Sequence, residues 1–167
     1  MAEELKRTVV IGLGSPIMSD DAVGLKISEA VEELKLPDVD TLQEAVGGLD
    51  IIPMVRGYRY AVIVDAIQTF EYEPGTVLIF NPEDFDSTVA DVPAHDVNLA
   101  TAIKMGRTLE PEMMPLAIRF VAVEVKDLQT VSESMTQNVL ASVGPAKNAV
   151  LHILEEFRSL DAKDRTS

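Results

Sequence analysis

The sequence contains no cysteine and no tryptophan, and only two of its 167 residues are histidine. Without cysteine the chain can form neither disulfides nor thiol nucleophiles, and metal sites with thiolate ligands are excluded. The scarcity of histidine leaves His95 and His152 as the candidates for a catalytic or metal-binding imidazole. Any site chemistry therefore rests on carboxylates and one of these two imidazoles.

Basic residues are also scarce, because 14 Lys and Arg stand against 28 Asp and Glu, for a formal net charge of -14. This balance argues against a broad nucleic-acid-binding face and against adhesion to an anionic membrane. No apolar segment approaches the length of a membrane span. Glu3 and Glu4 precede the first apolar segment, which does not fit a secretory signal. We expect a cytoplasmic monomer that binds neither nucleic acid nor membrane.

Strand-like segments alternate with helix-like segments, which predicts a single α/β domain over residues 1–167 with a charged, frayed tail from about residue 159. The expected fold is a three-layer sandwich, in which a mostly parallel central sheet of about five strands has helices on both faces. The expected strands are 8–13, 39–44, 60–64, 76–80 and 117–123, and the expected helices are 22–35, 49–56, 97–105 and 136–157. We expect a loop over 81–93 and a bend or break of the last helix at Gly144 and Pro145.

Acidic residues and one histidine stand where the predicted strands end or the helices begin. The first strand runs through a glycine loop into Asp20 and Asp21, the third ends in Asp65, and His95 stands just before a helical pattern. In an open α/β sheet, ligands bind outside the carboxyl ends of the strands. Carboxylates and an imidazole together form a ligand set that nickel, zinc and other divalent ions accept. The pattern predicts a small metal-reading or hydrolytic site.

Each of these residues also has a structural interpretation. Asp20 and Asp21 precede a helix, where acids cap unpaired N–H groups; if Asp20 mainly caps, an amide there costs well under about 1 kcal/mol. Asp65 can cap a loop, and His95 can be an exposed loop histidine. His152 lies within the last predicted helix, and we interpret it as structural.

Other classes of function are less well supported. A dinucleotide fingerprint beginning at Gly12 requires a third glycine at position 17, which is Ile17, and the acid pair would repel a pyrophosphate. We therefore expect no tightly bound organic cofactor. The chain has neither the Gly-x-Ser-x-Gly sequence of many serine hydrolases nor the His-Glu-x-x-His sequence of zinc peptidases.

Taken together, these blocks resemble the hydrogenase maturation proteases, the endopeptidases that complete the large subunits of nickel–iron hydrogenases. The opening pattern of that family is a strand, Gly-x-Gly-Asn, four spacer residues, two acids and a glycine, and residues 12–24 match it. The later blocks match at 62–66, at 74–77 and at Ala94-His95 with Leu99. The sequence around His95 looks closest to that of the branch that serves hydrogenases reducing coenzyme F-420 in methanogenic archaea. Ser15 replaces the asparagine that is usual at this position in the family. Residues 45–48 lack the Asp-Gly-Gly-Thr motif that is common in the family.

The resemblance implies a metal-reading triad of Asp21, Asp65 and His95, which recognises nickel already installed in the hydrogenase large-subunit precursor. The enzyme then removes a C-terminal peptide, so that nickel belongs to the substrate. Either Asp21 or Asp65 acts as general base on water, or the triad only docks the metal. The alternative function is a non-catalytic nickel-binding checkpoint or chaperone for the same precursor.

Overall fold

The computed structural model describes residues 6–45, 50–86 and 94–166 of the chain. Its strands form one sheet in the order β2-β1-β3-β5-β4. The first three neighbouring pairs in this order are parallel, and β4 pairs antiparallel to β5 at one edge. The strands are β1 (Lys6–Leu13), β2 (Val39–Glu44), β3 (Tyr58–Ile67), β4 (Val77–Phe80) and β5 (Ala117–Glu124). The predicted sheet of five mostly parallel strands is confirmed.

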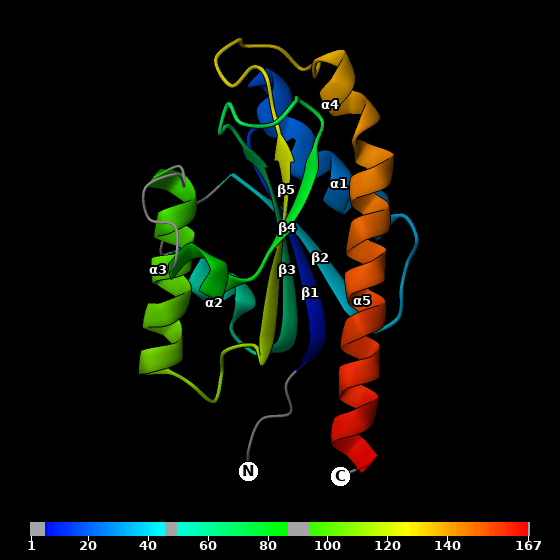
Figure 1. The fold of residues 1–167 in the computed structure, drawn as a ribbon. Coiled ribbons are helices and arrows are strands. Elements are labelled where there is room, and N and C mark those ends of the chain that lie inside the picture. Colours follow the sequence, from blue (N-terminus) through cyan, green and yellow to red (C-terminus); the bar gives the residue numbers. More distant parts are fainter. Residues whose placement is uncertain (1–5, 46–49, 87–93, 167) are drawn as a thin grey trace.

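Helices cover both faces of this sheet, as predicted (Figure 1). The helices are α1 (Val23–Glu32), α2 (Ile51–Val55), α3 (Ala94–Leu109), α4 (Gln137–Ala141) and α5 (Val143–Thr166), with short 3-10 helices η1 (Ser19–Ala22) and η3 (Pro82–Asp86). One face carries α1 and α5, and the other carries α2 and α3. No helix in the described part of the chain is both long enough and apolar enough to cross a membrane.

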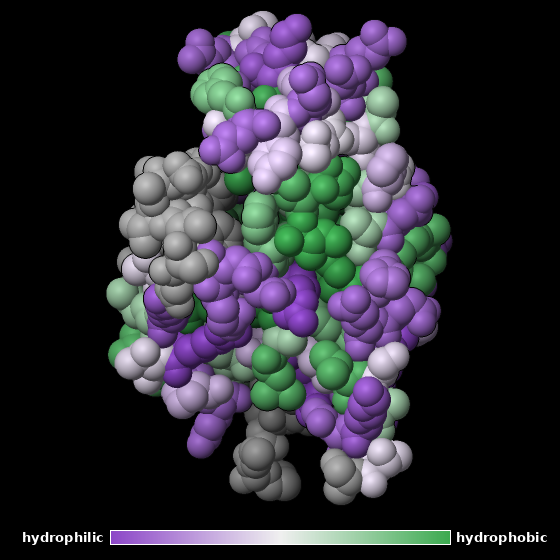
Figure 2. All heavy atoms as spheres, viewed as in Figure 1, coloured by the Kyte–Doolittle hydropathy of each residue, from purple (hydrophilic) through white to green (hydrophobic). Residues whose placement is uncertain are grey.

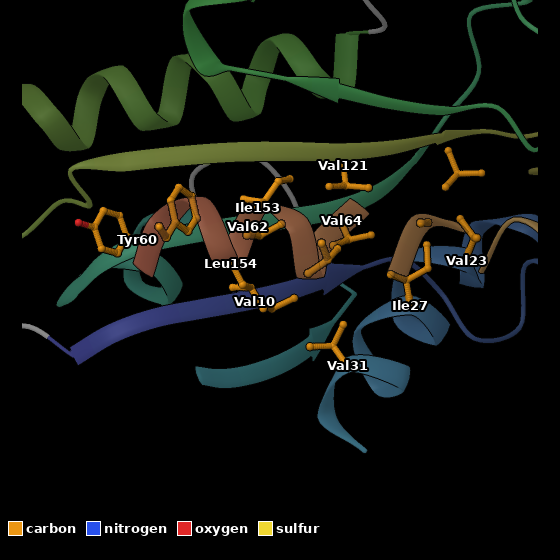
Figure 3. Packing of buried hydrophobic residues seen from close by; sticks show 14 of the residues in the cluster. Val10, Val23, Ile27, Val31, Tyr60, Val62, Val64, Val121, Ile153 and Leu154 are labelled. Carbon is orange, nitrogen blue, oxygen red and sulfur yellow. The ribbon is translucent and has the colours of Figure 1, made fainter. Parts of the chain in front are cut away.

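The central strands are apolar on both sides because each side faces a layer of helices. Val10 and Val62 pack in the cluster that contains Ile153 and Leu154 of α5 (Figure 3). Ile63, the next residue along β3, points the other way and packs in the cluster that contains Ile103 of α3. Successive side chains of a strand alternate between the faces, so one apolar segment fills two cores.

The last helical region differs in detail from the prediction. The break falls at Ser142, between α4 and α5, two residues before the expected Gly144. Pro145 lies in the first turn of α5, where a backbone N–H has no acceptor within the helix, so this proline does not interrupt the helix. The segment expected as a loop over 81–93 contains η3 in its described portion.

The charged tail is not frayed over its described length, because α5 remains helical to Thr166. Asp161 explains this result. Its buried carboxylate lies 3.1 Å from Nε of Arg59 and 3.5 Å from Nε of Arg7. Both arginines belong to the amino ends of strands, so these ion pairs tie the end of α5 to the sheet.

Candidate functional site

The carboxyl ends of β1 and β3 lie side by side, with Gly12 opposite Val64. From β1 the chain passes through α1 to β2 on one side of β1, while β3 lies on the other side. This is the topological switch point of the sheet, where ligands of open α/β folds bind. The segment η1, which contains Asp21, follows β1 and contacts β3.

Glycines allow this close approach. A Cβ atom added to Gly24 of α1 would lie 2.4 Å from the carbonyl oxygen of Leu13 and 2.6 Å from that of Val64. At Gly14, where φ is +145°, an added Cβ would lie 1.9 Å from the carbonyl oxygen of Asp21. The glycine pattern therefore has a packing role, because it brings the start of α1 down onto the ends of two strands.

Asp21 is half-buried, and its carboxylate is oriented by the preceding loop. Its Oδ2 accepts a hydrogen bond of 2.9 Å from the backbone N–H of Ser15. This bond uses only the backbone of Ser15, so either serine or asparagine at this position can make it. Among the described residues, no donor contacts Oδ1 of Asp21, and a carboxylate held by one oxygen is suited to present the other to a ligand.

Asp65 is buried near the carboxyl end of β3, as the sequence predicted. The strand continues to Ile67, so Asp65 lies two residues before its end. Its Oδ1 accepts a hydrogen bond of 2.8 Å from the backbone N–H of Ala66. The adjacent Val64 contacts Gly24, three residues after Asp21, and this places the backbones that carry the two acids next to each other.

The backbone of His95 lies in the first turn of α3 and not before the helix, because α3 begins at Ala94. The side chain of His95 lies outside the part that the structure describes, as does most of the loop over 45–48. The described side chains, without that of His95, contain no group of three His, Cys, Asp or Glu that could hold a metal ion. His152 is exposed on α5, 3.5 Å from the Glu156 carboxylate.

Asp20 does not cap the helix that follows it, contrary to the expectation. Neither η1 nor α1 has a side-chain cap in the structure. The fully buried carboxylate of Asp20 accepts hydrogen bonds from the backbone N–H groups of Lys126 (3.0 Å), Asp127 (2.9 Å) and Thr136 (2.7 Å). The Thr136 hydroxyl is a fourth donor, at 2.9 Å. Asp20 therefore fastens the loop after β5 to the start of α1.

Sequence reasoning missed Glu124, a second buried carboxylate that fastens a loop at this edge. It ends β5 and accepts a hydrogen bond of 2.9 Å from the backbone N–H of Thr69, and the Thr69 hydroxyl donates a further short bond. The signal was present, since Glu124 ends an apolar strand much as Asp65 does.

A family model, a curated relative and solved structures all relate this chain to hydrogenase maturation proteases. A model of the family described as hydrogenase maturation protease matches residues 32–153, a range that contains Asp65 and His95 but not Asp21. The chain is 28% identical over 153 residues to the hydrogenase 2 maturation protease of Escherichia coli K12, covering 90% of this chain and 92% of that protein. The fold matches the hydrogenase maturating endopeptidase HybD from E. coli, with a TM-score of 0.75, 26% identity and coverage of 90% and 93% of the two chains. The HybD maturation protease from Thermococcus kodakarensis shares the fold, with a TM-score of 0.74, 23% identity and coverage of 88% and 98%.

Proposed function

This chain belongs to the hydrogenase maturation protease family, and from that premise we propose that it is an endopeptidase acting on the precursor of a nickel–iron hydrogenase large subunit. It removes a C-terminal peptide from the nickel-loaded precursor and so completes its maturation. The observation that carries the proposal is the position of Asp21 and Asp65 at the switch point of the sheet. α3 runs opposite to the parallel strands, so its first turn, with His95, lies toward the same edge (Figure 1).

In this proposal Asp21, Asp65 and His95 read the nickel that the precursor carries. Two carboxylates and an imidazole are acceptable ligands for a divalent ion, and three protein ligands leave positions for the precursor's own groups. Nickel is thus part of the substrate, and the proposal includes no organic cofactor. It also includes action by a monomer in the cytoplasm, while the finer assignment to the coenzyme F-420 branch stays a prediction.

The chemistry follows from these roles. The triad would hold the precursor by its nickel, which would position the scissile carbonyl, while a carboxylate accepts a proton from the attacking water. The water oxygen bonds to the carbonyl carbon, the C–N bond breaks, and the carboxylate returns the proton to the departing amine. Either Asp21 or Asp65 serves as this base, and Asp21 is the more exposed of the two, since it is half-buried whereas Asp65 is buried.

Intact-mass measurement of the precursor tests the proposal. Incubation of nickel-loaded precursor with the purified protein is expected to yield a large subunit shortened by its C-terminal peptide, together with the peptide itself. A precursor that binds the protein and keeps its full mass contradicts the protease function and favours the non-catalytic checkpoint. The matched control is Asp65→Asn, which keeps the shape of the side chain and removes the charge.

A further inference from the structure

Loops that follow β1, β3 and β5 form a connected border at the carboxyl ends of the parallel strands, where Asp21 and Asp65 lie. We call this border the rim and define it as residues 14–18, 68–76 and 126–136. The N–H of Ser132 donates to the carbonyl oxygen of Ile17 at 2.9 Å, which joins the first and third loops. The amide of Gln68 donates to the carbonyl oxygen of Lys126 at 3.1 Å, which joins the second and third.

The rim carries the two most exposed large apolar side chains of the described residues, Phe70 at 85% and Val131 at 75%. Ile17 and Tyr72, also in the rim, are exposed as well. Figure 2 shows that this end of the molecule, at the top of the view, is otherwise largely hydrophilic. Exposed apolar side chains set in a polar border are typical of binding sites for other proteins.

Phe70 is held in a conformation that costs the fold free energy. Its φ is +63°, in the left-handed region that a bulky L residue rarely adopts. The residues beside it are fixed, because Thr69 is bonded to the buried Glu124 and the N–H of Glu71 donates to the Thr69 hydroxyl at 3.1 Å. Because Phe70 is almost fully exposed, burial of its side chain does not offset this strain. Backbone strain of this kind is concentrated at functional positions.

Val131 is presented in a similar way. Its loop is fastened near both ends by the buried Asp20, which accepts the N–H groups of Lys126 and Thr136. Two carboxylates buried in the protein thus hold two apolar tips out to solvent. Side chains ordered in advance lose less entropy on binding, and such anchors dominate the affinity of protein interfaces.

We propose that Phe70 and Val131 are docking anchors that insert into apolar pockets on the body of the hydrogenase large-subunit precursor. The inference rests on the proposed function, because the rim borders the edge to which the precursor must bring its nickel. The exposed Glu71 and Glu73 lie in the loop of Phe70, and the exposed Glu133 lies in the loop of Val131. The complementary surface therefore carries basic groups around its apolar pockets. Phe70 and Val131 then set how tightly the precursor binds, and the triad sets how fast it is cut.

The test measures both the Kd for nickel-loaded precursor, by biolayer interferometry, and the KM and kcat of its processing. Phe70→Ala and Val131→Ala are each expected to raise Kd and KM about tenfold while kcat stays unchanged. The matched control is Leu116→Ala, because Leu116 is also apolar and 61% exposed but precedes β5 at the opposite end of the sheet. It is expected to change none of Kd, KM and kcat.

A second variant separates docking from folding. Phe70→Gly removes the strained side chain, so it is expected to raise the melting temperature while weakening binding as much as Phe70→Ala does. Unchanged Kd in the two alanine variants, or an equal loss in Leu116→Ala, overturns the docking role. Because binding and cleavage are measured separately, a wild-type protein that binds and never cuts contradicts the protease function alone. A wild-type protein that does not bind the precursor overturns both.

Discussion

A carboxylate beside the end of a strand can serve the backbone or a ligand, and the neighbouring acids Asp20 and Asp21 illustrate the difference. Both oxygens of Asp20 accept hydrogen bonds from the loop after β5, and the side chain is fully buried. Asp21 is half-buried, and the backbone of Ser15 orients one of its oxygens. The first acid is therefore committed to structure and the second is suited to bind a metal.

Amide replacements of the two acids are expected to fail in opposite ways. In Asp20→Asn, at least one buried N–H loses its charged acceptor, and we expect a loss of about 2 kcal/mol in the free energy of unfolding. Asp21→Asn keeps the oxygen that accepts the Ser15 N–H and removes the charge that a divalent ion requires, so processing should collapse at unchanged stability. Urea denaturation and processing rates of folded protein measure both effects. Equal loss of stability in the two variants would contradict the distinction.

The sequence predicts where Asp21 and Asp65 lie because the carboxyl ends of parallel strands share one edge. It does not predict the role of Asp20, because the donors Lys126 and Thr136 lie 106 and 116 residues further along the chain. Capping is a local rule, and here long-range contacts replace it. For Glu124 the sequence shows the position, at the end of an apolar strand, but not the role, because its partner Thr69 is 55 residues away.

At the scale of elements, the position of α1 depends on Gly24. Alanine at this position would place a Cβ 2.4 and 2.6 Å from two backbone oxygens, which cannot rotate away as a side chain can. We expect Gly24→Ala to cost about 3 kcal/mol in the free energy of unfolding, because α1 must shift away from β1 and β3. The shift should also displace Asp21 and slow processing.

Gly144→Ala is the control for this prediction. Gly144 lies in the first turn of α5, and an added Cβ meets no atom within 4 Å. Alanine there should leave stability unchanged or raise it by up to about 1 kcal/mol. Thermal unfolding of the two variants measures the difference, and a neutral Gly24→Ala would show that the contact of α1 with the strand ends is not tight.

A second prediction at this scale concerns Tyr58 of β3, whose hydroxyl donates to Asp40 of β2 at 2.5 Å. Burial, together with this hydrogen bond and the charge of Asp40, raises the pKa of Tyr58 to about 12. Because the folded pKa lies above the ordinary value of 10.0, the stability that this contact contributes is full below pH 10 and is lost as the pH rises toward 12. Ultraviolet titration of phenolate absorbance tests this. If the difference in phenolate absorbance between wild type and Tyr58→Phe appears well below pH 12, the pKa of Tyr58 is not raised.

Most elements were predictable from the sequence, and their ends were less so. The segment Val39–Glu44 forms β2 as expected. β3 begins two residues earlier than predicted, at Tyr58, because Tyr58 pairs with Lys6 of β1 although its own sequence signal is weak. The end of α5 was missed because Asp161 gains its partners Arg7 and Arg59 only in the folded chain.

At the scale of the whole molecule, the two ends of the sheet have different tasks. At the amino end, the Asp161 ion pairs hold α5 against the strands. At the carboxyl end, two buried carboxylates hold loops whose apolar tips face solvent, next to Asp21 and Asp65. Structural ion pairs and the candidate site are thus separated by the length of the sheet, so variants at one end can be interpreted with little disturbance of the other.

The central claim is that Asp21, Asp65 and His95 read nickel in the precursor, and the most direct measurement is the processing rate of nickel-loaded and nickel-free precursor by the same enzyme. Wild type is expected to cut only the nickel-loaded form. Asp21→Asn and His95→Ala are expected to cut neither form while unfolding at the wild-type temperature. If wild type cuts both forms equally, or if His95→Ala cuts the nickel-loaded form at the full rate, the triad does not read nickel.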